Sequence, residues 1–317
     1  MSSAMAAGAP TAASGALLLD DWGLIRAQGD DAASFLHGQL TQDFAHLAAD
    51  RARLAGYCSA KGRLLASFVG WQAAPGEWLL ACSGDLLAPT LKRLSMFVLR
   101  ARCKLGDASA ERPLWGLAGA AAQQALGAAA PDVAWGRATY AGADVIRLPD
   151  ARLGELPVPR WLLAGTPPPG LPPLAASTWQ GLEASSGVAR IVAATAEQFV
   201  PQMINLELVG GVAFDKGCYP GQEVVARSQY RGTIKRRAAL FFAAAPLAPG
   251  QEIFHSGDAA QPAGRVVNAG VLPGLGPVVL AEVKLAALGA GTLHAGTAQG
   301  PLLRPGALPY ALPAEAP

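Results

Sequence analysis

The chain has 317 residues, of which 51% are apolar and 15% charged, and its formal net charge is +2. This length can bury a large core and predicts two or three domains. The small net charge gives no argument for nucleic-acid binding. Every apolar window of about twenty residues is interrupted by a charge or a proline, which argues against a membrane-spanning helix.

The cysteine spacing and the N-terminal sequence argue against further classes of protein. Cys58, Cys82, Cys103 and Cys218 are far apart and form no C-x-x-C pair. This spacing argues against a zinc ribbon, a dithiol redox motif and a local iron–sulfur ligand set, so we expect no metal site. A reduced, cytoplasmic protein is the simplest interpretation. Residues 1–16 are rich in Ala, Ser and Gly without the basic start of a signal peptide, and predict a disordered tail.

Residues 17–148 predict a mixed α and β subdomain. Apolar runs on either side of Asp20 and Asp21 predict two short strands, and Asp30 or Asp31 is expected to cap the helix that follows. The strand expected at 98–105 has a basic face, which solvent exposure explains better than a binding role. Strands are predicted at 53–58, 63–71, 78–82, 98–105, 114–119 and 145–148, and helices at 85–97 and 120–130.

The second half of the chain contains more turns. Eight prolines between Pro149 and Pro173 predict an irregular connector. Ser177 is expected to cap a helix that ends at Gly187. Short apolar runs that alternate with Gly/Pro turns are typical of a small antiparallel barrel. The segments are therefore a connector at 149–176, a second α+β segment at 177–237, the barrel at 238–305 and a loose tail at 306–317.

The most informative stretch runs from Asp215 to Arg227 and reads DKGCYPGQEVVAR. Gly217, Gly221 and Pro220 favour a tight, defined turn that presents Cys218.

Cations near this turn bear on the reactivity of its thiol. Lys216, Arg227 and Arg231 supply positive potential, which stabilises a thiolate. In the alternative interpretation, Cys218 is only a small buried hydrophobe in a Gly/Pro turn. Gln222 and Glu223 favour a functional site, because a plain turn does not need them.

The sequence resembles a known family on these residues. The string K-G-C-Y-x-G-Q-E at 216–223, together with residues 199–207 and 210–215, is similar to the YgfZ family of folate-binding proteins. That family is related to the aminomethyltransferase, or T protein, of the glycine cleavage system. The resemblance covers most of residues 17–300 and extends to 20–22, 39–43, 59–63, Trp179 and Gly187.

The resemblance implies an α+β fold of three subdomains around a central hole, the third being the antiparallel β-barrel. The ligand would be tetrahydrofolate or a one-carbon derivative, bound in part by the N-terminal subdomain. Trp22 and Trp179 match family tryptophans that contact folate, and an indole face suits a flat ring; without the resemblance, core packing is the better interpretation of both. The partners implied are iron–sulfur client enzymes, including a radical tRNA-modifying enzyme, or cluster carriers.

Two positions depart from the transferase pattern. Our alignment places Ala66 where the transferases carry a catalytic aspartate, so no residue is assigned to the general acid/base step. The same alignment places Ser185 at the position where the transferases carry a glutamate that binds the pterin. Glu183 lies two residues earlier and is expected to project about 200° away around the helix.

Three hypotheses follow. The first is a folate-binding accessory protein for iron–sulfur cluster assembly or repair, for which Ala66 favours a role without turnover catalysis. Its candidate site consists of the active thiol Cys218 with Lys216, Tyr219, Gln222 and Glu223. The second is a one-carbon enzyme that replaces the missing aspartate with Asp43 or Glu223. The third is a tRNA-binding module, whose cations would equally suit a polyglutamyl folate tail: Arg227, Arg231, Lys235, Arg236 and Arg237.

Overall fold

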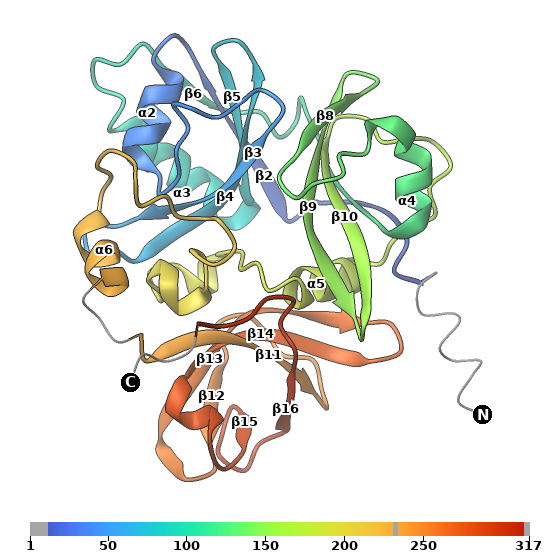
Figure 1. Cartoon of the computed structure of the whole chain (residues 1–317), viewed down its shortest axis with the longest axis vertical. Helices are drawn as coiled ribbons and strands as arrows, with labels where there is room; N and C mark the ends of the chain where they lie inside the picture. Colours follow the sequence, from blue (N-terminus) through green and yellow to red (C-terminus); the bar gives the residue numbers. More distant parts are fainter. Residues whose placement is uncertain (1–11, 231–233, 314–317) are drawn as a thin grey trace.

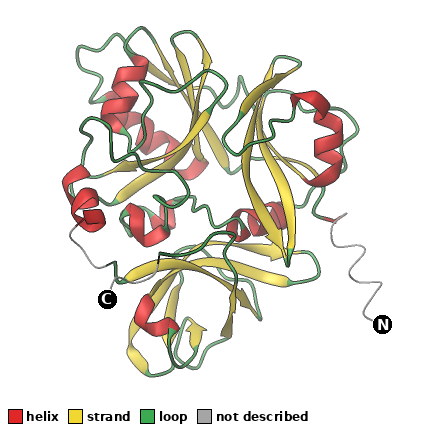
Figure 2. Cartoon of the chain, viewed as in Figure 1, coloured by secondary structure: helices red, strands yellow, loops and turns green. Residues whose placement is uncertain are grey.

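A computed structural model describes residues 12–230 and 234–313. Three β-structures, two open sheets and one closed barrel, lie around a common centre (Figure 1), and short helices flank them (Figure 2). One continuous buried cluster joins them, with Leu24 from the first sheet, Leu162 from the second and Leu240 from the barrel. No helix within the described ranges is long and apolar enough to cross a membrane. The predicted α+β class with an antiparallel barrel is confirmed.

The first sheet has the strand order β3-β4-β5-β2-β6. The predicted hairpin is present as β3 and β4 at one edge of this sheet, with Gly62 in the turn at φ 69°, which a residue without a Cβ adopts easily. The predicted strand at 98–105 is wrong, because only its last residues pair with β2. The elements are β2 (Trp22–Gln28), α2 (Ala32–Gln39), β3 (Ala52–Cys58), β4 (Leu64–Ala74), β5 (Glu77–Ser83), α3 (Gly84–Ser95) and β6 (Lys104–Asp107).

Of the two predicted helix caps, one is at the expected position and one is wrong. Asp31 is the N-cap residue of α2, but its carboxylate makes no cap hydrogen bond and instead accepts one from the backbone N–H of Arg102. Ser177 lies inside the first turn of its helix, and Ala175 is at the N-cap.

The second sheet has the order β1-β7-β10-β9-β8. The expectation that residues 149–173 are irregular is wrong up to residue 164, because β9 and β10 form a long hairpin there. Their register shifts between Val158 and Arg160, so Pro149 and Pro159 lie at an irregularity where a missing N–H is tolerated. The elements are β1 (Gly15–Leu18), β7 (Leu114–Ala118), α4 (Gly119–Leu126), β8 (Arg137–Tyr140), β9 (Ala143–Leu153) and β10 (Leu156–Ala164).

A helix and a long loop region lead from the second sheet to the barrel. Helix α5 (Ala176–Ser185) packs on the barrel at two glycines, since a Cβ on Gly270 would lie 2.0 Å from the backbone nitrogen of Gly181. After α6 (Gln222–Tyr230) the chain closes a barrel in the order β11-β14-β13-β12-β15-β16. Its strands are β11 (Arg236–Ala243), β12 (Glu252–His255), β13 (Asp258–Leu272), β14 (Gly276–Lys284), β15 (Leu293–Ala295) and β16 (Leu302–Gly306).

The chain ends are more ordered than expected where they are described. Residues 1–11 and 314–317 of the two predicted tails lie outside the described residues. Within the described part, β1 begins at Gly15, and the hydroxyl of Tyr310 donates a 2.7 Å hydrogen bond to the carbonyl of Gly187.

The first strand of the barrel is joined to the preceding loop by a buried ion pair between Arg237 and Glu207, both less than a tenth exposed at the side chain. We expect Arg237→Ala to lower the free energy of unfolding by about 3 kcal/mol, because the change leaves a buried carboxylate without its partner. Urea denaturation measures this loss. Lys235→Ala, at an exposed position two residues away, is the control and should change stability by less than about 0.5 kcal/mol. Equal losses in the two variants would contradict the expectation.

Candidate functional site

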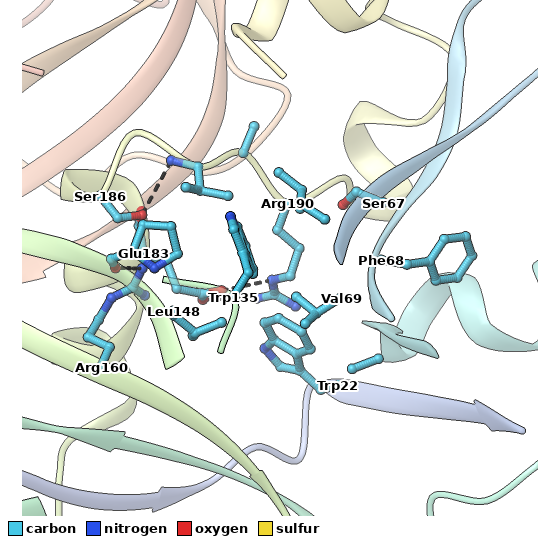
Figure 3. A pocket seen from close by; sticks show the side chains of 15 residues that line it. Trp22, Ser67, Phe68, Val69, Trp135, Leu148, Arg160, Glu183, Ser186 and Arg190 are labelled. Carbon is cyan, nitrogen blue, oxygen red and sulfur yellow. Dashed lines mark hydrogen bonds and ion pairs between the residues drawn. The ribbon is translucent and has the colours of Figure 1, made fainter. Parts of the chain in front are cut away.

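A cavity lies between the two open sheets, α5 and the loop after α5, with an empty volume of about 420 Å³ including its opening (Figure 3). Two tryptophans, a carboxylate and two guanidinium groups line it, a combination of flat apolar and charged groups that is typical of ligand sites. They come from the first sheet, the second sheet, α5 and the loop after α5: Trp22, Trp135, Arg160, Glu183 and Arg190.

Arg190 is the centre of the charge network in this cavity. Its guanidinium donates a 2.7 Å hydrogen bond to Asp21 and lies 3.3 Å from the Glu183 carboxylate and 4.8 Å above the ring centre of Trp22. Burial alone would lower the pKa of Arg190, but the carboxylates of Glu183 and Asp21 raise it. The residue therefore stays charged although it is less than a tenth exposed.

Glu183 and Arg160 complete the network. Burial raises the pKa of Glu183, and the positive charges of Arg190 and Arg160 oppose that shift. Burial lowers the pKa of Arg160 to about 10, and the nearby Glu183 charge opposes this. One buried carboxylate thus lies between two buried cations, an arrangement that keeps charges inside the protein by mutual pairing.

Two buried donors of residues that line this cavity have no hydrogen-bond partner. They are Nε1 of Trp22 and Nε of Arg160. Buried donors are normally paired, so unused donors around one cavity indicate a place for a ligand or for water.

The three residues predicted to contact folate lie in different environments. Trp22 lines the cavity. Trp179 does not, because its ring is buried against Gly116 of β7, with the Arg160 guanidinium 5.4 Å from the ring centre. Arg227 is exposed on α6 and does not line the cavity.

Two expectations from the transferase alignment are wrong. Glu183, expected to project away, lines the cavity, whereas the Ser185 hydroxyl is fully buried and donates to the carbonyl of Leu182. Ser67 lines the cavity and Ala66 does not, since neighbouring residues of a strand point to opposite faces. The residue next to the position aligned with the catalytic aspartate therefore presents a serine hydroxyl to the cavity.

Three cavity residues were missed by the sequence reasoning, namely Trp135, Arg160 and Arg190. Trp135 adopts φ 63°, a conformation that is rare for bulky residues and concentrates at functional sites. Arg190 did carry a signal, because it is a single cation in the apolar run from Val188 to Val192. Arg160 had none, since it was expected to lie in an irregular connector.

Two wider cavities share walls with the first. One, of about 840 Å³, shares Leu148, Pro149 and Ser186 with it, and the other, of about 870 Å³, shares Glu183 and Arg190. The three cavities therefore follow one another through the junction of the β-structures.

The loop that contains Cys218 forms a second candidate site, between α2, the β3–β4 turn and α6 (Figure 1). Cys218 is exposed, so the alternative in which it is a buried hydrophobe is wrong. Gly221 packs on the hairpin turn, where a Cβ would lie 2.3 Å from the carbonyl oxygen of Ser59. The turn holding Cys218 thus requires this glycine.

Lys216 attaches this loop to the end of α2. Its ammonium donates to the carbonyl oxygens of His37 and of Leu40, the latter at 2.6 Å, which are acceptors left free at a helix C-terminus. Burial lowers the pKa of Lys216 to about 8, and the nearby Asp43 and Cys218 oppose this shift. Lys216 is therefore both an anchor and a cation close to the thiol.

The other predicted residues of the motif have distinct environments. Tyr219 is buried beneath Lys216, whose ammonium is 5.1 Å from the ring centre, and burial raises the pKa of its phenol. Its hydroxyl has no hydrogen-bond partner. Gln222 and Glu223 begin α6, with Glu223 exposed. None of these residues lines the central cavity.

Two histidines and an aspartate also lie beside this loop, although none of the three is close to Cys218 in the sequence. His37 Nδ1 is 2.9 Å from Asp43 Oδ1, and His46 Nδ1 is 2.8 Å from Asp43 Oδ2. Partial burial alone would raise the pKa of Asp43, but the hydrogen bonds of His46 and His37 lower it to about 2. No group of three His, Cys, Asp or Glu in the described part of the chain is arranged to hold a metal ion.

The basic cluster considered for tRNA is only partly available. Arg231 lies outside the described residues. Arg236 pairs with Glu282 at 2.7 Å, and Arg237 pairs with Glu207 inside the structure. Lys235 and Arg227 are exposed.

The pKa of Lys216 gives a pH-dependent prediction. Between about pH 8 and the ordinary lysine value the unfolded chain binds more protons than the folded chain, so Lys216 makes stability rise with pH. From about pH 7.5 to about pH 9.5, wild type should gain about 1 kcal/mol relative to Lys216→Met, after a reduction for partial solvent screening. Urea unfolding of both proteins at each pH measures the gain. Parallel pH profiles would show that burial does not affect this amine.

Comparison with known proteins identifies the family. A protein described as tRNA-modifying protein YgfZ from Edwardsiella ictaluri (strain 93-146) is 37% identical over 239 residues, covering 71% of this chain and 69% of the relative. The protein of the same description from Sodalis glossinidius (strain morsitans) is 34% identical over 241 residues, covering 71% and 70%. No model of a protein family matches the sequence.

A solved structure shows the same fold. The glycine cleavage system aminomethyltransferase T from Bartonella henselae matches with a TM-score of 0.73 at 16% identity, over 93% of this chain and 86% of that one. The predicted aminomethyltransferase-like fold is therefore confirmed. Because the relatives are more than 30% identical over more than two thirds of their length, the chain belongs to the YgfZ family.

Proposed function

We propose that this protein binds tetrahydrofolate, or a one-carbon derivative of it, in the central cavity and serves as an accessory factor for iron–sulfur enzymes, including enzymes that modify tRNA. One observation carries the ligand half of this proposal. A buried carboxylate, Glu183, lies between two cations beside the indole of Trp22, in a cavity lined by both open sheets, α5 and the loop after it.

The chemistry of these groups suits a reduced folate. The pterin ring presents neighbouring N–H donors, which the two oxygens of the Glu183 carboxylate can accept together. The unused Nε donor of Arg160 suits an acceptor atom of the ring. The indoles of Trp22 and Trp135 offer flat faces for stacking. A bound folate would supply one-carbon carrier chemistry, while these residues bind and orient it.

Equilibrium binding of tetrahydrofolate tests the ligand half. We expect Trp22→Ala to weaken binding by about tenfold, the size of one lost aromatic stacking contact. Trp115→Ala is the matched control, because Trp115 is a partly buried tryptophan that does not line the cavity, and it should bind as wild type does. Absence of binding to wild type itself would remove this half of the proposal.

The iron–sulfur half rests on Cys218 and on the family. The YgfZ relatives are described as tRNA-modifying proteins, and Cys218 is an exposed thiol beside the ammonium of Lys216. A single cysteine cannot hold a cluster alone, so a cluster at this position would need ligands from a partner. In this proposal Cys218 is the reactive group that serves the partner's cluster.

Complementation in a cell that lacks the protein tests the role of the thiol. We expect Cys218→Ala to fail to restore the activity of an iron–sulfur enzyme that wild type restores. Cys103→Ala is the control, since Cys103 is the other cysteine that is not fully buried. Full restoration by Cys218→Ala would show that the thiol is not needed.

The two other hypotheses have less support. The carboxylates considered for one-carbon transfer, Asp43 and Glu223, do not line the cavity. Direct tRNA binding has two fewer cations available, because Arg236 and Arg237 are held in ion pairs.

A further inference from the structure

We infer that His37, oriented by Asp43, is the acid–base partner of Cys218: it accepts the thiol proton on Nε2 and so increases the fraction of thiolate at neutral pH. This assignment rests on the proposed function, in which Cys218 is the reactive group. The sequence offered no such partner, because His37 lies 181 positions before Cys218 in the chain.

The hydrogen bond to Asp43 determines which ring nitrogen of His37 carries the hydrogen. The pKa of Asp43 is about 2, so its carboxylate is ionised and can only accept hydrogen bonds at neutral pH. His37 must therefore carry a hydrogen on Nδ1, which faces this carboxylate at 2.9 Å. In the neutral ring the lone pair is then on Nε2, the nitrogen on the opposite side.

That free nitrogen faces the cysteine loop. A Cβ built on Gly217 would lie 3.4 Å from His37 Nε2, and no hydrogen bond within the described residues occupies this nitrogen. Lys216 holds the loop in place through the carbonyls of His37 and Leu40. Cys218 follows Gly217 directly, with its Cα about 3.8 Å further along the chain, so the exposed thiol belongs to the residue next to the one that faces the ring.

The proposed step moves one proton from Cys218 to His37 and needs no further reactant. The Sγ–H bond of Cys218 breaks and an Nε2–H bond forms on His37, which leaves a thiolate and an imidazolium. Asp43 stabilises the imidazolium through the hydrogen bond to Nδ1, as a carboxylate does in hydrolase triads. The Lys216 ammonium adds positive charge near the thiolate.

Other charges around the ring must be considered in any pH experiment. His46 shares the Asp43 carboxylate from the loop after α2, and Lys216 and Asp215 belong to the cysteine loop. Of these groups, Lys216 can change its charge within the pH range of the experiment, because burial lowers its pKa to about 8. His46 makes an equivalent hydrogen bond to Asp43 and is 81% exposed at the side chain. It is therefore a matched control for a purely structural role of the histidine.

The experiment measures alkylation of Cys218 by iodoacetamide in the full-length protein between about pH 5 and about pH 9, the range over which imidazoles and thiols titrate. Peptide mass spectrometry separates Cys218 from the buried Cys58 and Cys82 and from Cys103. We expect His37→Gln to slow alkylation at neutral pH by about tenfold and to change the shape of the pH profile, because only the thiolate reacts. Asp43→Asn should also slow it, since an amide does not stabilise the imidazolium.

His46→Gln should leave the rate and the profile unchanged. Thermal unfolding of all variants checks that each is folded. Identical profiles for wild type and His37→Gln, or equal losses in His37→Gln and His46→Gln, would overturn the assignment. The alkylation assay needs no client enzyme, so its outcome is distinct from complementation by Cys218→Ala, which decides the proposed function.

Discussion

The structure depends on one buried cation, Arg190. Its guanidinium binds Asp21 beside the first sheet and Glu183 on α5, and its backbone exchanges two 3.0 Å hydrogen bonds with Asn268 of the barrel. A buried charge is costly unless it is paired, so these contacts can form only when the sheet, the helix and the barrel occupy one relative arrangement. The same pairing keeps polar groups at the junction instead of a close-packed apolar core, and the central cavity lies beside them.

The two candidate sites share a structural support, the β3–β4 hairpin. Its turn contacts Gly221 in the cysteine loop, and Ser67, farther along β4, lines the cavity and accepts a 2.9 Å hydrogen bond from the backbone of Ile191. Gly62 and Ser67 are separated by five positions, roughly 15 Å along an extended chain. In the proposed function the folate and the thiol therefore act at separate places on one rigid element, which suits a protein that holds a ligand inside and presents a thiol to a partner outside.

The sequence predicted local features well where they depend on neighbours in the chain. The hairpin around Gly62, helix α5 and the barrel strands follow from turn residues and apolar periodicity. The prediction of an irregular segment at 149–164 was wrong because it relied on the prolines. A proline is tolerated where the β9–β10 register shifts, and this shift depends on the partner strand. The assumed orientation of Glu183 was wrong for a similar reason: an alignment assigns a position along a helix, but not which side faces a cavity.

By itself, the sequence determined the family, through the string at 216–223, and with it the fold class and the importance of the Cys218 loop. The tertiary structure decided which side chains share a site. Trp22 lies at the cavity with Glu183 and Arg190, whereas Trp179 is buried in the core. His37 lies beside the loop of Cys218. The physical reason is that these contacts join residues far apart in the chain. They arise only when buried charges are paired and backbones approach at glycines, neither of which local pattern encodes.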